Sequence, residues 1–477
     1  MVVLEIIFWL SLFTIFYSYA GYGILIIILS KVPILIKLLP KPSNRVKSEM
    51  LGSEGEDYYP DVSMIISASG ENRDIIRQKI RNTAELEYPR EKLEVIFAIA
   101  YDKNSESDET LTEYYDNFLS SFNPPDVTSK DEEAYVKFSR FEESGHRDFS
   151  VLHEMETELN NSEISTEDIS HGAKYKLDEH FGAEELEELT VRVTKDIERK
   201  GKIAQVNRTV LTARGDIIVF SDANSMFNKS ALINITRHFR DTRVGCVAGE
   251  KRVKQSENST SGEGEGLYWK YESVLKKIDS EIWTTIGAAG EIFSVRKELW
   301  NNVIEDDAII EDFLVSMRIA GLGYRVIYEP GAYAEEEPTF NLSEEFKRRR
   351  RIAAGGFQSM VRLMYLLNIF KYRVLTFQYV SHRVLRWAVV PFLLPVCLAL
   401  NVLILMINFN VVYLILLMSQ FLFYFLAFAG YMMELKGKKI KAFYFPFLLT
   451  MMNWAAYVGL KRYLRNEQKV VWERAKR

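Results

Sequence analysis

Apolar residues gather near the two ends of this 477-residue chain, and charged residues gather in its middle. The first apolar run extends from about Leu4 to Ser30 and contains one charged residue, Glu5. It is long enough to cross a hydrocarbon core, which needs about 20 apolar residues. A cleaved signal peptide is the competing interpretation, but the run exceeds an h-region of about 7 to 15 residues and no basic segment precedes it. We therefore predict an N-terminal transmembrane helix.

Three more apolar runs lie near the C-terminus. They span about Leu385 to Ile407, Val411 to Tyr431 and Phe443 to Leu460, and each approaches or reaches spanning length. The last run contains Pro446 and Asn453, which also permit an interfacial or re-entrant segment. We predict two to three C-terminal transmembrane helices, and the side on which the basic tail lies stays open.

Basic residues next to the apolar runs predict the topology, because cytoplasmic flanks carry an excess of Lys and Arg. Such residues follow the first run between positions 31 and 47, and others precede the second run between positions 347 and 373. Both flanks place the central region in the cytoplasm. The chain has only two cysteines, Cys246 and Cys397, so no disulfide framework is available. We expect an integral protein of the cell membrane with a cytoplasmic domain.

The central region alternates strand-like and helix-like patterns. The short apolar run Val62 to Ala68 precedes a helical pattern, and a second apolar run follows from Leu93 to Ala100. Segments 189–194, 202–214 and 216–221 repeat this rhythm, which is typical of crossover units on a parallel sheet. The predicted fold class is therefore α/β. Ligands bind at the carboxyl ends of such strands, so chemistry is expected just after Ala68, Ala100 and Ser221.

Two pairs of residues, one of an acid and an amide and one of two acids, are candidates for chemistry. Asp222 and Asn224 follow the strand that ends at Ser221, where their oxygens can share a hard cation, although Asp222 can equally begin a turn or cap a helix. Glu311 and Asp312 open a predicted helix. The positive end of the helix dipole is sufficient to explain two carboxylates in the first turn. A carboxylate that projects into a cleft is also what a general base requires.

Five consecutive cations occupy positions 347 to 351 on a predicted helix, where only some can face one side. A solvated or lipid-facing surface explains them because the membrane is close. The functional alternative is a guanidinium that grips a diphosphate.

The order of these motifs resembles the inverting enzymes of glycosyltransferase family 2, especially the membrane-embedded branch akin to cellulose, hyaluronan and poly-N-acetylglucosamine synthases. The stretch 65–72 matches the family phrase IIPAYNEE and retains Glu71, while 101–110 matches SDGSTDGT with Asp102 in the expected position. The stretch 199–207 is similar to RxGKAxALN and contains Lys202. These stretches cover the first half of the resemblance.

The remaining motifs follow in family order. Residues 222–224 stand where the family has DxD, with Asn in place of the second Asp, and 287–296 looks like the donor-sugar segment that contains Gly290. Glu311 and Asp312 match the family's ED pair. Where processive members have QRxRW, Arg349 and Arg351 match the arginines, but Arg348 and Ile352 replace Gln and Trp. Loss of that Trp, part of an acceptor platform, weakens the case for long-polymer synthesis.

The resemblance implies a cytosolic GT-A domain that uses a nucleotide sugar, first of all a UDP-sugar. By that match Asp312 is the catalytic base, Asp222 and Asn224 hold a divalent metal (Mn or Mg), and the donor is bound by a set of residues: Glu71, Asp102, Lys202, Asp222, Gly290, Arg349 and Arg351. The expected partners are the donor, a lipid-linked or glycan acceptor and membrane lipid. No nucleic-acid partner is expected.

The preferred function is addition of one sugar to a lipid-linked or glycan acceptor. A processive polysaccharide synthase and, from another class, a non-catalytic membrane scaffold remain alternatives. The segment 123–188, rich in Glu, Asp and Ser, is expected to be a solvated insertion or a regulatory lobe. The predicted organisation is a transmembrane helix (1–31), a linker (32–59), the GT-A domain (60–356), interfacial helices (357–384), a transmembrane region (385–460) and a basic tail (461–477).

Overall fold

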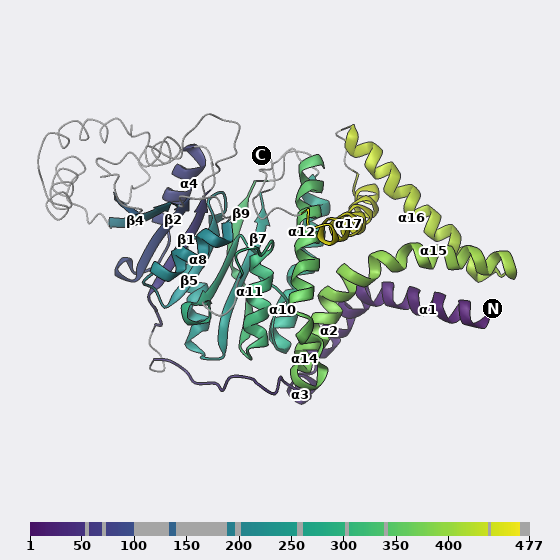
Figure 1. The fold of residues 1–477 in the computed structure, drawn as a ribbon, viewed down its shortest axis with the longest axis horizontal. Coiled ribbons are helices and arrows are strands. Elements are labelled where there is room, and N and C mark those ends of the chain that lie inside the picture. The colour runs from purple at the N-terminus through teal and green to yellow at the C-terminus, as the bar shows by residue number, and fades with distance from the viewer. Residues whose placement is uncertain are drawn as a thin grey trace, which may run out of the picture.

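The computed structural model of this chain consists of a sheet domain from which long helices project to one side (Figure 1). It describes residues 1–52, 57–68, 73–99, 133–139, 188–195, 202–254, 261–300, 305–337, 342–436 and 440–467. Glu71, Asp102 and most of the predicted insertion lie outside the described residues.

Nine strands of the described residues form one mixed sheet in the order β3-β4-β2-β1-β5-β8-β7-β9-β6. Neighbours β4, β2, β1 and β5 run parallel, as the alternating pattern predicts, whereas β8 is antiparallel to both β5 and β7. The strands are β1 (Val62–Ala68), β2 (Leu93–Ile99), β3 (Glu133–Ser139), β4 (Glu188–Lys195), β5 (Ile217–Asp222), β6 (Met226–Phe227), β7 (Val244–Val253), β8 (Ile292–Arg296) and β9 (Arg325–Glu336).

Helices cover both faces of this sheet, and neighbouring residues of β1 serve opposite faces because side chains alternate along a strand. Met64 packs with Ile80 in one core, whereas Ile65 packs with Val206 and Leu314 in the other. Burial on both faces explains why the strand is a nearly continuous apolar run. The helices are α4 (Arg73–Ala84), η2 (Arg90–Lys92), α8 (Lys202–Thr212), α9 (Ala231–Thr236), η3 (Arg237–Arg240), α10 (Ser261–Ile282), η4 (Lys297–Leu299) and α11 (Glu311–Gly321).

Within the described ranges, four helical segments are long and apolar enough to cross a membrane: Val2–Ser30, Val374–Ile407, Val411–Leu435 and Ala442–Leu464. This confirms one N-terminal and three C-terminal candidates. The first combines α1 (Val2–Phe16), η1 (Tyr17–Gly21) and α2 (Tyr22–Ser30). The second combines α14 (Val374–Tyr379), η6 (Val380–Val389) and α15 (Val390–Ile407), and the others are α16 (Val411–Leu435) and α17 (Lys441–Leu464).

The segment between the sheet domain and these spans is mostly helical. Helix α12 runs from Leu342 to Arg362 and packs along α17, so the domain boundary predicted after residue 356 falls inside one helix. The short helix α3 (Pro33–Leu38) follows the first span, and the short helices η5 (Met364–Leu367) and α13 (Ile369–Tyr372) precede the second.

A buried polar cluster joins α10 of the sheet domain to η6. The imidazole of His382 is fully buried, with Nδ1 2.6 Å from Asp279 and Nε2 3.2 Å from Glu272. Arg383 and Arg386 approach the same Glu272 carboxylate at 2.7 and 3.0 Å. Burial alone would raise the pKa of Glu272, but these cationic neighbours outweigh it and hold the pKa well below its usual range. These ion pairs explain how Arg383 and Arg386 are accommodated in the otherwise apolar second span.

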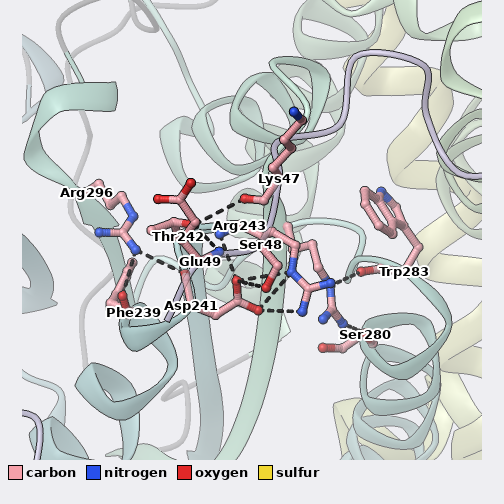
Figure 2. Close-up of polar contacts among 11 residues, drawn as sticks. Lys47, Ser48, Glu49, Phe239, Asp241, Thr242, Arg243, Ser280, Trp283 and Arg296 are labelled. Atoms are coloured by element: carbon pink, nitrogen blue, oxygen red, sulfur yellow. Dashed lines mark hydrogen bonds and ion pairs between the residues drawn. The ribbon is translucent and has the colours of Figure 1, made fainter. Parts of the chain in front are cut away.

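A second connection is an extended strap, residues 41–51, which follows the first span along the edge of the sheet domain. Figure 2 shows the strap meeting the loop before β7: the Thr242 N–H donates to the Glu49 carbonyl, the Glu49 N–H donates to the Thr242 hydroxyl, and the Ser48 hydroxyl lies 3.2 Å from Asp241. Further along, the strap passes Gly323 so closely that a Cβ there would lie 2.0 Å from the Asn44 carbonyl oxygen. The chain therefore requires glycine at position 323, where φ is +101°.

Candidate active site

The candidate site lies where the parallel strands end. Strands β1 and β5 pair in parallel, with Ser67 opposite Asp222 at their carboxyl ends. Helix α8 begins at Lys202, whose Nζ contacts Asp222 Oδ1 at 2.7 Å and Glu311 Oε1 at 3.0 Å. Although burial alone would lower the pKa of Lys202, the two carboxylates raise it above its usual value. Residues distant in the sequence thus form one cationic centre between two acids.

Asp312 lies beside this centre in the first turn of α11. Burial and the Glu311 carboxylate raise its pKa to about 7. Gly290 faces it across the site, since a Cβ added to that glycine would lie 3.5 Å from Asp312 Oδ2. The carboxylate therefore has a proton affinity suited to general-base work at neutral pH, and its neighbour across the site is a residue without a side chain.

A second charged group forms the wall near Gly290. Lys251 on β7 contacts Glu291, and its Nζ is 2.6 Å from Glu336 Oε2. Glu336 also accepts a 2.7 Å hydrogen bond from the Ser225 hydroxyl, and Arg348 lies 3.2 Å from Glu291. Burial would raise the pKa of Glu291, but Lys251 and Arg348 lower it below its usual value. The wall is held by ion pairs between elements far apart in the sequence.

The two arginines predicted to bind the donor, Arg349 and Arg351, do not both lie near Asp222 and Glu311. Arg351 is close enough to Glu311, Asp222 and Asp312 for their charges to act on its guanidinium, and burial lowers its pKa against their influence. Arg349 instead pairs with Glu345 one turn earlier, at 2.7 Å, and lines an apolar cavity next to the membrane helices. The two arginines predicted as a pair thus face different surroundings.

The oxygen ligands of Asp222 and Asn224 fit a metal ion that is also bound by the phosphates of the substrate. Among the described residues no group of three or more His, Cys, Asp or Glu side chains forms a ready metal site. Asp222 supplies a carboxylate, and the partly buried Asn224 lies two residues further on. Magnesium is usually held by one or two carboxylates together with substrate phosphates, so one carboxylate and one amide suffice for that mode of binding.

Several site residues escaped prediction from sequence. Lys79 is fully buried under the site, where its Nζ donates a 2.7 Å hydrogen bond to Ser221, and burial lowers its pKa to about 7. Lys251 and Glu336 meet only through the pairing of β7 with β9. The periodicity around them carries no signal of these contacts. Glu291 lies within the stretch that resembles the donor-sugar segment and could have been singled out there.

Part of the chain matches a known protein family. Residues 217–432 match the family model described as glycosyl transferase family group 2. The poly-beta-1,6-N-acetyl-D-glucosamine synthase of Staphylococcus aureus (strain COL) is 28% identical over 172 residues, which cover 35% of this chain and 41% of the relative. The chain thus spans less than half the length of the curated relatives it matches.

A solved structure covers almost the whole chain. The mannosyltransferase PcManGT from Pyrobaculum calidifontis, in complex with GDP-Man and Mn2+, matches with a TM-score of 0.59 at 18% identity, over 98% of this chain and 100% of that one. This likeness shows the fold, and the predicted α/β GT-A class with additional membrane-type helices is confirmed. The family whose model matches residues 217–432 is the one that the motifs predict, and the Staphylococcus aureus relative is a synthase of this kind.

Proposed function

We propose that this protein is an inverting glycosyltransferase that moves a sugar from a nucleotide sugar, first of all a UDP-sugar, to a lipid-linked or glycan acceptor at the membrane. The observation that carries the proposal is Asp312, which lies next to Gly290 and the Lys202 cluster and whose pKa near 7 suits it to deprotonate an acceptor hydroxyl. The sheet domain is then the cytoplasmic part of an integral membrane protein.

In this mechanism Asp312 accepts the proton of the acceptor hydroxyl as its oxygen attacks the anomeric carbon. The leaving diphosphate carries negative charge, and the ammonium of Lys202 and the guanidinium of Arg351 lie within the same cluster to balance it. Glu311 keeps Lys202 in place through their 3.0 Å contact. Attack from the face opposite the leaving group inverts the configuration.

Asp222 and Asn224 are the residues that would hold Mn or Mg. A bound divalent ion neutralises charge on the diphosphate oxygens. The only carboxylate of this pair already contacts Lys202, so we expect the ion to arrive with the nucleotide sugar and to depend on its phosphates. We also propose that Glu71 and Asp102, which are not among the described residues, contact the nucleotide. Gly290 is proposed to face the donor sugar.

The decisive experiment measures release of nucleoside diphosphate from a panel of nucleotide sugars by the full-length protein in membranes, with Mn2+, Mg2+ or chelator. Asp312→Asn should abolish metal-dependent release. Asp57→Asn is a matched control because Asp57 is exposed and lies before the opposite end of β1. Release that survives in the Asp312 variant would refute the assignment of the base.

A processive synthase is the second candidate, supported by the name of the Staphylococcus aureus relative. It would form polymer from donor alone, which product sizing detects, whereas transfer of one sugar yields a single product. Donor binding without turnover under all conditions would instead favour the membrane scaffold.

A further inference from the structure

An apolar cavity of about 690 Å³ lies between the site and the membrane helices. Helix α17 forms one wall with Phe445, Leu449 and Met452, and α12 forms another with Ile352 and Phe357. Its volume falls within the roughly 300 to 1,000 Å³ that is usual for small-molecule sites. Its lining suits hydrocarbon, because apolar cavities do not hold water well.

The cavity adjoins the proposed base. Trp387 lines it and packs against Phe313, with ring centroids 5.2 Å apart, and Phe313 directly follows Asp312. On the other side Arg349 and Ile352 of α12 line the cavity, while Arg351 of the same helix lies in the charged cluster. One helix and one ring contact therefore separate the hydrocarbon space from the reacting groups.

Two arginines contribute charge to the cavity wall, and each contacts a carboxylate of the protein. Arg349 contacts Glu345 at 2.7 Å, and Arg386 shares the Glu272 carboxylate with Arg383, at 3.0 and 2.7 Å. Both arginines thus have a carboxylate partner within the protein without an anionic head group. A base at Asp312 likewise suits an acceptor that must lose a proton, such as an alcohol, better than a phosphate that is already ionised.

We propose that this cavity binds the hydrocarbon chain of a neutral, hydroxyl-bearing lipid, and that this lipid is the sugar acceptor. The inference rests on the proposed function. The lipid hydroxyl oxygen forms a bond to the anomeric carbon as the bond from that carbon to the diphosphate oxygen breaks. Its proton passes to Asp312, and the nucleoside diphosphate leaves with the electron pair. Ile352, which stands where processive members have Trp, here forms part of the wall for the chain.

The test uses the full-length protein in phosphatidylcholine vesicles that contain a diacylglycerol with a diazirine on one acyl chain. Phosphatidic acid with the same chains is the anionic counterpart. After photolysis, mass spectrometry should find diacylglycerol attached to the cavity-lining part of α17 around Leu449. Leu449→Trp should reduce that labelling about tenfold, the effect of excluding about two methylene groups. Incubation with donor should yield sugar-bearing diacylglycerol, again reduced in the variant.

Leu422→Trp on α16 is the matched control, because Leu422 is 57% exposed and does not line the cavity. Donor binding shows whether each variant is folded, and Met452→Trp, on the same wall, replaces Leu449→Trp if the latter fails that check. Labelling spread evenly over α16 and α17, or unchanged by both cavity variants, would overturn the inference. Equal or stronger labelling by phosphatidic acid would also overturn it.

Donor turnover and cavity labelling are separate readouts. Nucleoside diphosphate release that depends on Asp312, without cavity labelling, leaves the proposed function standing and removes the lipid acceptor. Cavity labelling without turnover of any donor refutes the proposed function and, with it, the acceptor role of the lipid.

Discussion

The pH dependence of turnover offers a direct test of Asp312 as the base. With a pKa of about 7, about one Asp312 in eleven is ionised at pH 6 and about ten in eleven at pH 8. If the ionised form is the active base, kcat at saturating donor should rise about tenfold between these pH values and level off above pH 8.

Glu311 provides the perturbation, because its negative charge helps to raise the pKa of Asp312. Glu311→Gln removes that charge, so the rise in kcat should move to lower pH while Lys202 keeps its 2.7 Å contact with Asp222. The assay is nucleoside diphosphate release from pH 5 to 9 in one mixed buffer of constant ionic strength. A rise in kcat that lies below pH 5 in the unaltered protein, or that stays in place in Glu311→Gln, would refute the reasoning.

The raised pKa of Asp312 also affects the free energy of unfolding. The folded state binds the Asp312 proton up to about pH 7, whereas the unfolded chain loses it near 3.8. Stability therefore falls as pH rises from about 4 to about 7, by at most about 4 kcal/mol, since one pKa unit corresponds to about 1.4 kcal/mol. Asp312→Asn should become progressively more stabilising through that window in thermal unfolding. Its loss of activity then cannot be attributed to misfolding.

Three further variants test other parts of the structure. Lys202→Met should lower kcat/KM for the donor about 10- to 100-fold, because hydrogen bonds to charged groups contribute about 1.5 to 3 kcal/mol. Gly323→Ala should destabilise the fold by about 1 to 3 kcal/mol or more, measured as a lower unfolding midpoint, since positive φ and the Asn44 carbonyl both oppose a Cβ. Glu272→Gln should cost about 3 to 5 kcal/mol in the same measurement, because it leaves buried cations without their carboxylate.

Each variant has a counterpart of the same residue type at an exposed position. Lys229→Met removes a lysine whose side chain is 62% exposed and should leave kcat/KM unchanged. Gly52→Ala also imposes positive φ, but a Cβ there meets nothing within 4 Å, so it should cost less than Gly323→Ala. Glu281→Gln alters an exposed residue of α10 and should leave the midpoint unchanged. Equal effects within any pair would contradict the corresponding argument.

The buried strands were predictable because their sequence signal is local. The apolar run Val62 to Ala68 coincides with β1, and the predicted strand before Asp222 differs from β5 by one residue at each end. The parallel crossover pattern then brings the ends of these strands together. The ion pair of Lys251 with Glu336 depends instead on strand pairing across the sheet, for which the sequence has no local pattern.

The arginine helix shows how a motif and its geometry can disagree. The resemblance assigned Arg349 and Arg351 together to the donor. Residues two apart on an α-helix point about 200° apart, so both cannot face one ligand from a regular helix. In the structure only Arg351 lies in the charged cluster, and Arg349 turns to Glu345 and the apolar cavity. The periodicity of an α-helix alone could have predicted that Arg349 and Arg351 point in different directions.

The strap and the buried polar cluster together limit how the protein can work. The strap attaches the chain after the first span to the loop before β7, and the cluster around Glu272 attaches α10 to the second span. These two attachments are far apart in the sequence, and together they restrict rotation of the sheet domain relative to the long helices. If Asp312 is the base, as we propose, it is held at one level relative to the long apolar helices. An acceptor would then have to reach that level, and acceptors would be selected by how deeply they sit in the membrane.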